Sequence, residues 1–364
     1  MLHVTRTARA ARKARNAAEA ASARRVPRPR PAPAEPRHAS TLVLIVLLPQ
    51  TNLLDAAGVA ETLRIANEAG AAFDLRFVGP RARVKSSVGL ALMGVAALPR
   101  RLPDGAMVVL LGARRTAEDF TLPEADTVVR WIARTFDPER HQIATVCGGA
   151  LLAARAGLLN GRACTTHHAL IERLAREAPA ARVLQNRIFV QDGPVATSAG
   201  VTAGIDLALH LVASQADPRI AADTAREMVV YARRTGDDPQ LSPWLAHRGH
   251  LHPAVHRVQD AVTRDPARDW TVAAMAMVAH VGNRHLARLF TEHAGVGPHE
   301  WLSRIRVELA RLALVHGASS VERAAEAAGF GSAHALRRAW RRCREDTPSG
   351  VRAAADVRAG VDVA

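Results

Sequence analysis

The sequence predicts an α/β sandwich with a mostly parallel sheet, followed by an all-α domain that contains two helix-turn-helix units. Short apolar runs alternate with helical patterns from Leu42 to about Val212, as expected for parallel crossover units with helices on both faces of a sheet. Beyond Pro253 the strands vanish, and helical periodicity continues through Arg344. The chain length of 364 residues also exceeds what one hydrophobic core usually organises.

The composition favours a polyanionic partner. The formal net charge is +15 and the pI is near 11.3, which suggests either nucleic acid or an acidic membrane face. The cysteines, Cys147, Cys164 and Cys343, have no paired or CxxC spacing, so no disulfide framework or zinc ribbon is implied, and we expect a cytoplasmic protein. The longest apolar run, which begins at Leu42, is too short to cross a bilayer. We therefore expect no membrane partner.

The basic N-terminal segment is predicted to be disordered, because it is rich in Ala, Arg and Pro and poor in large apolar residues. It is either a dispensable extension or a nonspecific DNA-binding arm. The predicted organisation is a tail over 1–39, an α/β domain over 40–235, a linker over 236–253, an all-α domain over 254–350 and a disordered tail over 351–364.

The first domain is predicted to alternate strands and helices in a regular order. The strands are expected at 41–49, 73–80, 106–113 and 141–146, and the helices at 54–70, 124–136 and 148–159. The segment "ARVLQNRIFVQDGPVATSAG" breaks this rhythm and predicts a hairpin that turns at Asp192 and Gly193. A further helix is expected from about Thr202.

Cys147 lies where a predicted strand turns sharply into a helix. The backbone at such a turn is strained, and the main-chain N–H groups of Gly148 and Gly149 lie beside the thiol. A helix N-terminus there would stabilise a thiolate, so Cys147 is the candidate reactive residue. It is an inert buried residue, a ligand-pocket residue without turnover, or a catalytic nucleophile. Cys164 and Cys343 are expected to be packing residues.

The helical domain contains one pattern twice, a small-residue helix followed by a tight turn and a basic amphipathic helix. The pattern occupies Val272 to Ala294 and Val321 to Arg344, and residues 297–317 between them are long enough for one connecting helix. This is the geometry of two helix-turn-helix units placed in successive major grooves of DNA.

Helical spacing places basic side chains on the outer face of each second helix and apolar side chains on its inner face. The inner residues are Leu286, Leu289 and Phe290 in the first unit and Leu336 and Trp340 in the second. The predicted DNA-binding residues are Arg284, Arg288, Thr291, His334, Arg337, Arg338 and Arg341. We expect Arg284, Arg288, His334 and Arg338 to contact bases, and the others to contact phosphates.

Four histidines follow the first domain in the linker, at His247, His250, His252 and His256. They have no cysteine or carboxylate partner at a metal-binding spacing. We expect them to be solvated loop residues, and we expect neither a metal nor another cofactor.

The helical domain resembles the DNA-binding domain of the AraC/XylS transcription regulators. The matching residues are "GVGP" at 295–298, Leu286, Arg288, Phe290, Arg306, Ala310, Leu314 and "AAGFGSAHALRRAW" at 327–340. The resemblance covers roughly ninety residues and implies sequence-specific binding to double-stranded promoter DNA.

The first domain resembles the ThiJ/PfpI domain of the class I glutamine-amidotransferase-like superfamily, on the motifs "LLDAAGVAETLRIAN" at 53–67, "TVCGGALLAARAGLLNGRACTTHH" at 145–168, "VATSAGVTAGIDLALHLV" at 195–212 and "DPRIAADTAREMVVYARRTG" at 217–236. The fusion of both domains resembles the GlxA family of regulators. The resemblance implies an acidic residue near the thiol, which matches Asp55, and a histidine that matches His167. The ligand-pocket candidates are Cys147, Asp55, Gly112, Gly148 and His167.

These observations predict a transcription regulator that is not an enzyme. The resemblance implies a small-molecule effector, RNA polymerase and a second copy of the chain as partners, and control of amino-acid or quaternary-amine catabolism, often as an activator. Two alternatives remain, a Cys147-dependent hydratase or lyase and a thiol-based electrophile sensor. The protease-like members carry a histidine directly after the cysteine, whereas this chain has Gly148, so peptidase activity is not expected.

Overall fold

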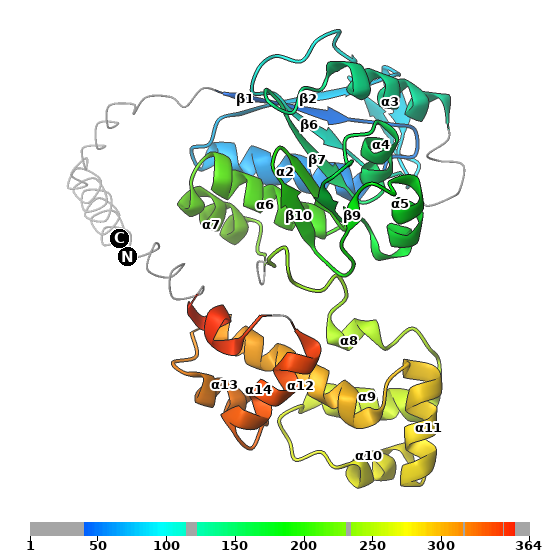
Figure 1. The fold of residues 1–364 in the computed structure, drawn as a ribbon, viewed down its shortest axis with the longest axis vertical. Coiled ribbons are helices and arrows are strands. Elements are labelled where there is room, and N and C mark those ends of the chain that lie inside the picture. Colours follow the sequence, from blue (N-terminus) through cyan, green and yellow to red (C-terminus); the bar gives the residue numbers. More distant parts are fainter. Residues whose placement is uncertain (1–39, 114–121, 231–233, 316, 345, 354–364) are drawn as a thin grey trace, which may run out of the picture. The chain divides into compact units, whose positions relative to one another are not determined.

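The computed structural model describes residues 40–113, 122–230, 234–315, 317–344 and 346–353 (Figure 1). The predicted tail over 1–39 and the end of the chain from 354 lie outside the described residues. In the described part, no helix is both long and apolar enough to cross a bilayer.

The first domain is the predicted α/β sandwich. Its seven-stranded sheet has the order β10-β11-β7-β6-β1-β2-β5. The strands are β1 (Thr41–Val46), β2 (Phe73–Gly79), β5 (Ala96–Ala97), β6 (Met107–Leu110), β7 (Gln142–Val146), β10 (Phe189–Asp192) and β11 (Val195–Ser198). All neighbouring strands pair in parallel except β10 and β11. These two form the predicted antiparallel hairpin, which turns at Gly193, where φ is 60°.

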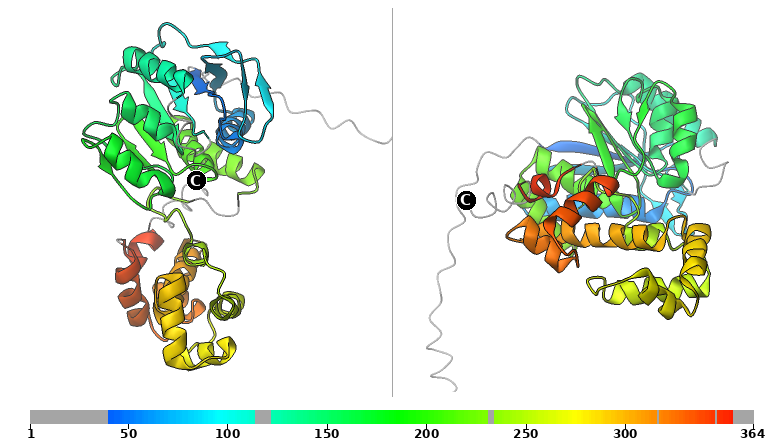
Figure 2. Two further views of the ribbon diagram at one scale, coloured as in Figure 1. Left: turned by 90° about the vertical axis from the view of Figure 1, so that its right-hand side faces the viewer. Right: turned by 60° about the horizontal axis from the view of Figure 1, so that its bottom comes forward.

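Helices cover both faces of this sheet (Figures 1 and 2). One face carries α2 (Leu53–Glu68), α6 (Ala203–Gln215) and α7 (Pro218–Glu227), and the other carries α3 (Pro123–Thr135), α4 (Gly149–Arg155) and α5 (Ile171–Glu177). Because strand residues alternate between the faces, Leu44 and Val46 lie in the core beneath α3 and α4, whereas Val43 and Ile45 lie in the core beneath α2 and α6.

The sequence analysis missed two small sheets and a short helix. One sheet pairs β3 (Arg83–Lys85) with β4 (Ala91–Met93), and the other pairs β8 (Ala163–Cys164) with β9 (Arg182–Val183). The short 3-10 helix η1 (His168–Leu170) precedes α5. Strands of two or three residues are too short for their alternation to be recognised in a sequence.

The predicted linker is partly helical, since it contains α8 (Pro243–Ala246), and α9 (Pro253–Arg264) begins at its end. The helical domain continues with α10 (Val272–Ala279), α11 (Asn283–Ala294), α12 (Pro298–Val315), α13 (Val321–Ala327) and α14 (Ala333–Cys343). Residues 348–353 are also helical, so regular structure continues past residue 350, where the sequence predicted a disordered tail.

Helix α12 contributes to two separate hydrophobic cores. Its first half supplies Trp301, Leu302 and Ile305 to the core formed with α9, α10 and α11. Its second half supplies Ala310 and Leu314 to the core formed with α13 and α14. The pairs α10–α11 and α13–α14 are the two predicted helix-turn-helix units, which we call the first and second reader units.

Candidate functional site

The first reader unit presents its second helix, α11, with the predicted polarity. Leu286, Leu289 and Phe290 are buried, whereas the outward residues Arg284, Arg288 and Thr291 are exposed. The Arg288 guanidinium lies 3.1 Å from His285 Nδ1, and the Thr291 hydroxyl donates to the Ala287 carbonyl at 3.0 Å. The basic side chains of α11 are thus available to a partner.

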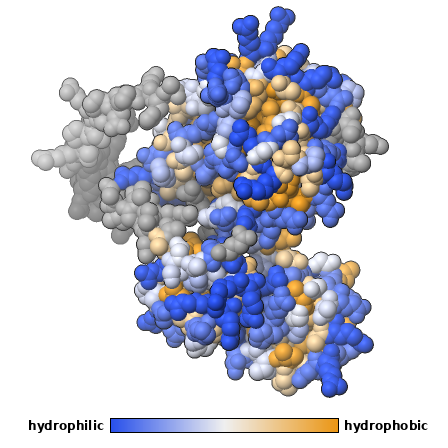
Figure 3. Space-filling model, viewed as in Figure 1, coloured by the Kyte–Doolittle hydropathy of each residue, from blue (hydrophilic) through white to orange (hydrophobic). Residues whose placement is uncertain are grey.

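The second reader unit repeats this arrangement on α14. Leu336 and Trp340 are fully buried, and the outward residues His334, Arg337, Arg338 and Arg341 are exposed. Ser332 caps the helix, because its hydroxyl accepts a hydrogen bond from the Ala335 N–H at 3.2 Å. Figure 3 shows mainly hydrophilic colours over the described helices around α14.

The turns of the two units are equivalent but are made by different residues. His280 ends α10 in the left-handed conformation, with φ of 56°, and Gly329 adopts φ of 77° in the turn after α13. A Cβ at Gly329 would lie 2.6 Å from the Ala267 carbonyl oxygen. Arg306 of α12 donates to the neighbouring carbonyls of Pro266 and Arg268 at 3.0 and 2.6 Å. The loop over 266–268 therefore packs against both α12 and the second turn.

Cys147 occupies the predicted strained turn between β7 and α4. Cys147 has a φ of 56° and is only 3% exposed, and its N–H donates to the Ser198 carbonyl at 3.1 Å. A left-handed φ in a residue other than glycine costs energy and must be held by its surroundings. Gly149, two residues further along the chain, is required, because a Cβ there would lie 2.1 Å from the Leu110 carbonyl oxygen.

Asp55, in the first turn of α2, is the carboxylate at this site, as the resemblance implies. It is completely buried, and its Oδ1 accepts hydrogen bonds from the Val201 N–H at 2.8 Å and the Asn52 side-chain amide at 3.2 Å. Its Oδ2 is buried and has no hydrogen-bond partner in the described part of the chain. Burial raises the pKa of Asp55 to about 6, although the N–H groups of Val201 and Gly112 act in the opposite direction.

Two glycines allow the acid and the thiol to come together. A Cβ at Gly112 would lie 2.9 Å from Asp55 Oδ2, from Cys147 Cβ and from the Gly148 nitrogen. A Cβ at Gly200, where φ is 86°, would lie 2.1 Å from Cys147 Cβ. We call Asp55, Gly112, Cys147, Gly148 and Gly200 the thiol site. The sequence analysis did not include Gly200, although the motif "SAG" after β11 was a signal for it.

His167 directly follows Thr166, which is the residue that contacts the thiol site. Its Nδ1 accepts a hydrogen bond from the Ala169 N–H at 3.2 Å, and its ring lies 4.3 Å from that of His168, centroid to centroid. The preceding residue, Thr166, is buried and donates its hydroxyl to the Cys147 carbonyl at 2.7 Å. Thr166 is thus a contact residue that the sequence analysis missed.

The predictions for the other two cysteines have different outcomes. Cys164 is fully buried, as expected for a packing residue, and burial together with the charge of Asp192 raises its pKa to about 11. The prediction for Cys343 is wrong, because this residue is exposed. It lines a cavity of about 650 Å³ beside the linker, together with Arg187, His247 and other residues.

The expectation of solvated linker histidines is also wrong. The ring centroids of His250 and His256 lie 4.5 Å apart, and those of His252 and His293 lie 4.4 Å apart. His247 Nδ1 lies 2.8 Å from the Ala294 carbonyl oxygen, at the end of α11. These rings pack the linker against the first reader unit. Within the described residues, no group of histidine, cysteine and acidic side chains is arranged to hold a metal ion.

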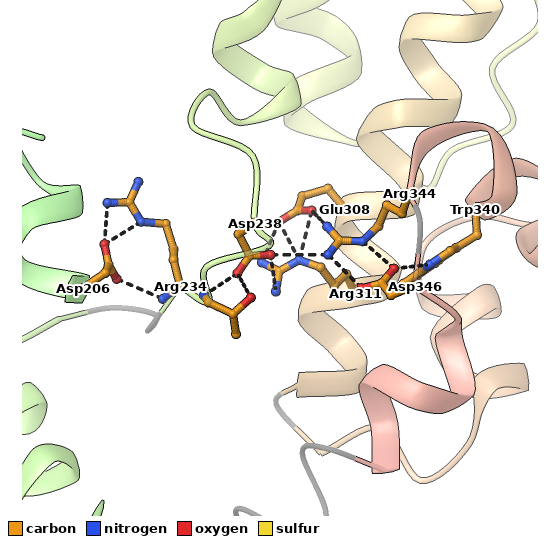
Figure 4. A network of polar contacts seen from close by, with 9 residues as sticks. Asp206, Arg234, Asp238, Glu308, Arg311, Trp340, Arg344 and Asp346 are labelled. Atoms are coloured by element: carbon orange, nitrogen blue, oxygen red, sulfur yellow. Dashed lines mark hydrogen bonds and ion pairs between the residues drawn. The ribbon is translucent and has the colours of Figure 1, made fainter. Parts of the chain in front are cut away.

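The linker also contacts the second reader unit through buried charges (Figure 4). Asp238 of the linker lies 3.5 Å from the guanidinium groups of Arg311 on α12 and of Arg344, directly after α14. Arg311 also pairs with Glu308 at 2.7 Å, and Arg344 pairs with Asp346 at 2.9 Å. We call these five residues the linker ion cluster. The sequence analysis did not predict it.

Comparison with known proteins identifies both domains. Residues 41–214 match the DJ-1/PfpI family, and residues 275–354 match a helix-turn-helix domain. The chain is 28% identical over 319 residues to the HTH-type transcriptional regulator CdhR of Pseudomonas aeruginosa, covering 86% of this chain and 92% of the relative. It is 32% identical over 215 residues to the HTH-type transcriptional regulator GlxA of Rhizobium meliloti, covering 58% and 65%. A segment of 88 residues is 38% identical to the isonitrile hydratase of Pseudomonas putida, covering 24% and 36%.

Proposed function

We propose that this chain is a transcriptional regulator of the GlxA family, in which a DJ-1/PfpI domain precedes a helix-turn-helix domain, and that it reads promoter DNA with α11 and α14 in response to a small molecule. The observation that carries this proposal is the pair of exposed basic helices held by one helix, α12. A protein that presents two such helices on a rigid spacer is suited to two successive major grooves.

The proposed contacts divide into two classes. Arg284, Arg288, His334 and Arg338 contact base edges, because arginine can donate two hydrogen bonds to guanine. Thr291, Arg337 and Arg341 contact phosphates, which fix the register but carry no sequence information. Arg337 lies 3.4 Å from Glu322 on α13.

The thiol site is the proposed place of effector recognition. It lies at the carboxyl ends of β6 and β7, where open α/β sheets usually bind their ligands, and it contains a buried acid whose Oδ2 has no hydrogen-bond partner in the described chain. An effector with a hydrogen-bond donor would satisfy that oxygen. We further propose that two copies of the chain bind repeated half-sites, that the chain acts with RNA polymerase, and that its targets belong to amino-acid or quaternary-amine catabolism.

We propose no turnover at Cys147. Both long matches are to transcriptional regulators, and the match to the hydratase covers only 24% of this chain. The hydratase alternative requires that Cys147→Ala abolish a measurable reaction. The regulator requires that Cys147→Ala retain DNA binding.

Genome-wide mapping of bound sites tests the function. The wild-type chain is compared with Arg284→Ala and Arg338→Ala, and with Arg64→Ala as a control that removes an exposed arginine from α2 of the first domain. Each reader variant should weaken binding to preferred sites by about 1–3 kcal/mol, and the control should bind as the wild type does. If both reader variants keep wild-type occupancy and salt dependence, the contact assignment is wrong.

A further inference from the structure

Asp238 is a buried carboxylate in the connection between the two domains. Asp238 is only 2% exposed. Its Oδ2 accepts hydrogen bonds from the Thr235 N–H at 2.7 Å and the Thr235 hydroxyl at 3.1 Å. Its Oδ1 lies 3.5 Å from both Arg311 and Arg344 (Figure 4). One oxygen of this side chain therefore faces the linker, and the other faces the guanidinium groups of Arg311 on α12 and of Arg344 directly after α14.

The reader side of the cluster is balanced without Asp238. Glu308 accepts from Arg311 at 3.0 and 2.7 Å, and Asp346 accepts from Arg344 at 2.9 Å through both oxygens. Two carboxylates thus neutralise two guanidinium groups before Asp238 is added. Because removing the partner of a buried charge is what destabilises most strongly, it matters that Arg311 and Arg344 each keep a carboxylate partner when Asp238 is withdrawn. Withdrawal of Asp238 would therefore leave no unpaired guanidinium group in this cluster.

The end of α14 is part of the same cluster. The indole N–H of Trp340, which is fully buried in the core of the second reader unit, donates to Asp346 Oδ1 at 2.8 Å. Arg344 is the C-cap residue of α14. A displacement of Asp238 therefore acts on the last turn of the helix that carries Arg338 and Arg341.

The linker around Asp238 is bound to the first domain. The Ile188 N–H donates to the carbonyls of Gly236 and Asp238, both at 3.1 Å. The Gln240 N–H donates to Asn186 Oδ1 at 3.1 Å. A Cβ at Gly236 would lie 2.6 Å from the Phe189 carbonyl oxygen, so the linker packs directly on the start of β10.

A short series of hydrogen bonds connects this linker to the thiol site. The side-chain amide of Gln240, two residues after Asp238, donates to the Thr166 carbonyl at 2.9 Å. The Thr166 hydroxyl in turn donates to the Cys147 carbonyl at 2.7 Å. A shift of the backbone at Cys147 would therefore move Thr166 and Gln240, and with them Asp238.

We propose that Asp238 is a positioning residue that sets the second recognition helix according to the state of the thiol site, through Gln240 and Thr166. This inference rests on the proposed function, because it requires that α14 bind DNA. Energetic coupling between two sites is reciprocal. DNA bound at α14 must therefore alter the local stability of the backbone around Thr166 and Cys147.

Hydrogen–deuterium exchange of the full-length chain tests this reciprocity. The probe is a duplex enriched by the wild-type chain from a random pool. Binding of this duplex should slow exchange of the amides in 147–151 and 165–167 by about fivefold or more, since local opening becomes rarer. Asp238→Asn, which keeps the size of the side chain but removes its charge, should still bind the duplex within about threefold but lose the slowing at both segments.

Asp237→Asn is the matched control. Asp237 is the neighbouring residue, and its side chain is 84% exposed in a 3.4 Å ion pair with Arg187, so this variant should behave as the wild type does. Gln240→Ala provides a second route to the same answer, because it breaks the link to Thr166 and leaves the linker ion cluster intact. It should lose the slowing as Asp238→Asn does.

Each outcome decides the proposal. If the wild-type chain enriches a duplex but shows no change of exchange at 165–167, the inference is wrong and the proposed function stands. The same follows if Asp238→Asn and Gln240→Ala keep the wild-type slowing. If the wild-type chain enriches no duplex at all, the proposed function fails and the inference fails with it.

Discussion

Ile305 and Val307 are two residues apart on α12, yet their side chains lie in different hydrophobic cores. The first is packed with α9, α10 and α11, and the second with α13 and α14. Residues two apart on a helix point to nearly opposite sides, so one helix can form the wall of both cores. The spacing between α11 and α14 is therefore set by a continuous helix and not by a loop.

This geometry predicts the effect of inserting one alanine between Arg306 and Val307. One residue rotates the second reader unit by about 100° and shifts it by about 1.5 Å, so α11 and α14 should no longer reach the same face of DNA. Binding to the enriched duplex should fall by roughly 100-fold, toward the affinity of a single unit. The measurement is fluorescence anisotropy with the intact duplex and with a duplex in which one half-site is scrambled.

Gly249→Ala, which adds one methyl group in the linker, is the control for that experiment. Gly249 is exposed, and a Cβ there would meet no atom within 4 Å. This variant should bind as the wild type does. If the α12 insertion bound the intact duplex as tightly as the wild type does, the rigid spacer would be contradicted.

Asp55 predicts a pH dependence of stability. Its pKa is raised from 3.8 to about 6 by burial, so the folded state holds this proton more tightly than the unfolded state does. The contribution of Asp55 is fully present below pH 3.8 and is lost as the pH rises through about 6, by an amount on the order of 2–3 kcal/mol. In thermal denaturation, Asp55→Asn should flatten the change of Tm between pH 4 and pH 7.

The matched comparison is Asp74→Asn, which removes an exposed carboxylate of β2 that pairs with Arg76 at 2.7 Å. That substitution should leave the slope of Tm against pH as it is in the wild type. A wild-type slope in Asp55→Asn would show that the carboxyl does not titrate as its burial requires.

The turns of the two reader units predict that substitutions at His280 and Gly329 change stability in opposite directions. Because His280 adopts a left-handed conformation with φ of 56°, His280→Gly should stabilise the first unit by about 1 kcal/mol. Gly329→Ala should destabilise the second unit, since its φ is 77° and the new Cβ would lie 2.6 Å from the Ala267 carbonyl oxygen. Denaturant titration followed by tryptophan fluorescence measures both changes, and a stabilised Gly329→Ala would refute the argument.

The histidine contacts of the linker predict that the folded state becomes less stable in acid. Burial, together with His256, His293, His252 and Arg248, lowers the pKa of His250 below its usual 6.5. The unfolded state therefore binds this proton first, and the contribution of His250 to stability is present above pH 6.5 and is lost as the pH falls below it.

The measurement for His250 is Tm between pH 5 and pH 8. His250→Gln should show a smaller loss of Tm toward pH 5 than the wild type does. His299→Gln, at an exposed residue of α12, is the control and should keep the wild-type profile. A His250→Gln profile that matches the wild type would mean that the ring contacts do not depend on protonation.

The sequence predicted what periodic patterns encode. The alternation of the main strands and helices along the chain, the hairpin at Gly193, the exposed face of α11 and the strained turn at Cys147 all follow from repeated spacing or from a local turn signal. Asp238 could not be found in this way, because "GDDPQ" resembles any polar linker and its two arginine partners lie about 70 and 100 residues further along the chain. The histidines were misjudged for the same reason, since His293 belongs to a different element.

The contact between Thr166 and Cys147 is made to the main-chain carbonyl of the cysteine and not to its sulfur. The proposed coupling through Thr166 therefore does not require the sulfur atom. A descendant with alanine at position 147 would lose the thiol of this site and keep a main-chain carbonyl for the Thr166 hydroxyl. Reactivity at the sulfur and the proposed coupling to α14 could therefore change independently in evolution.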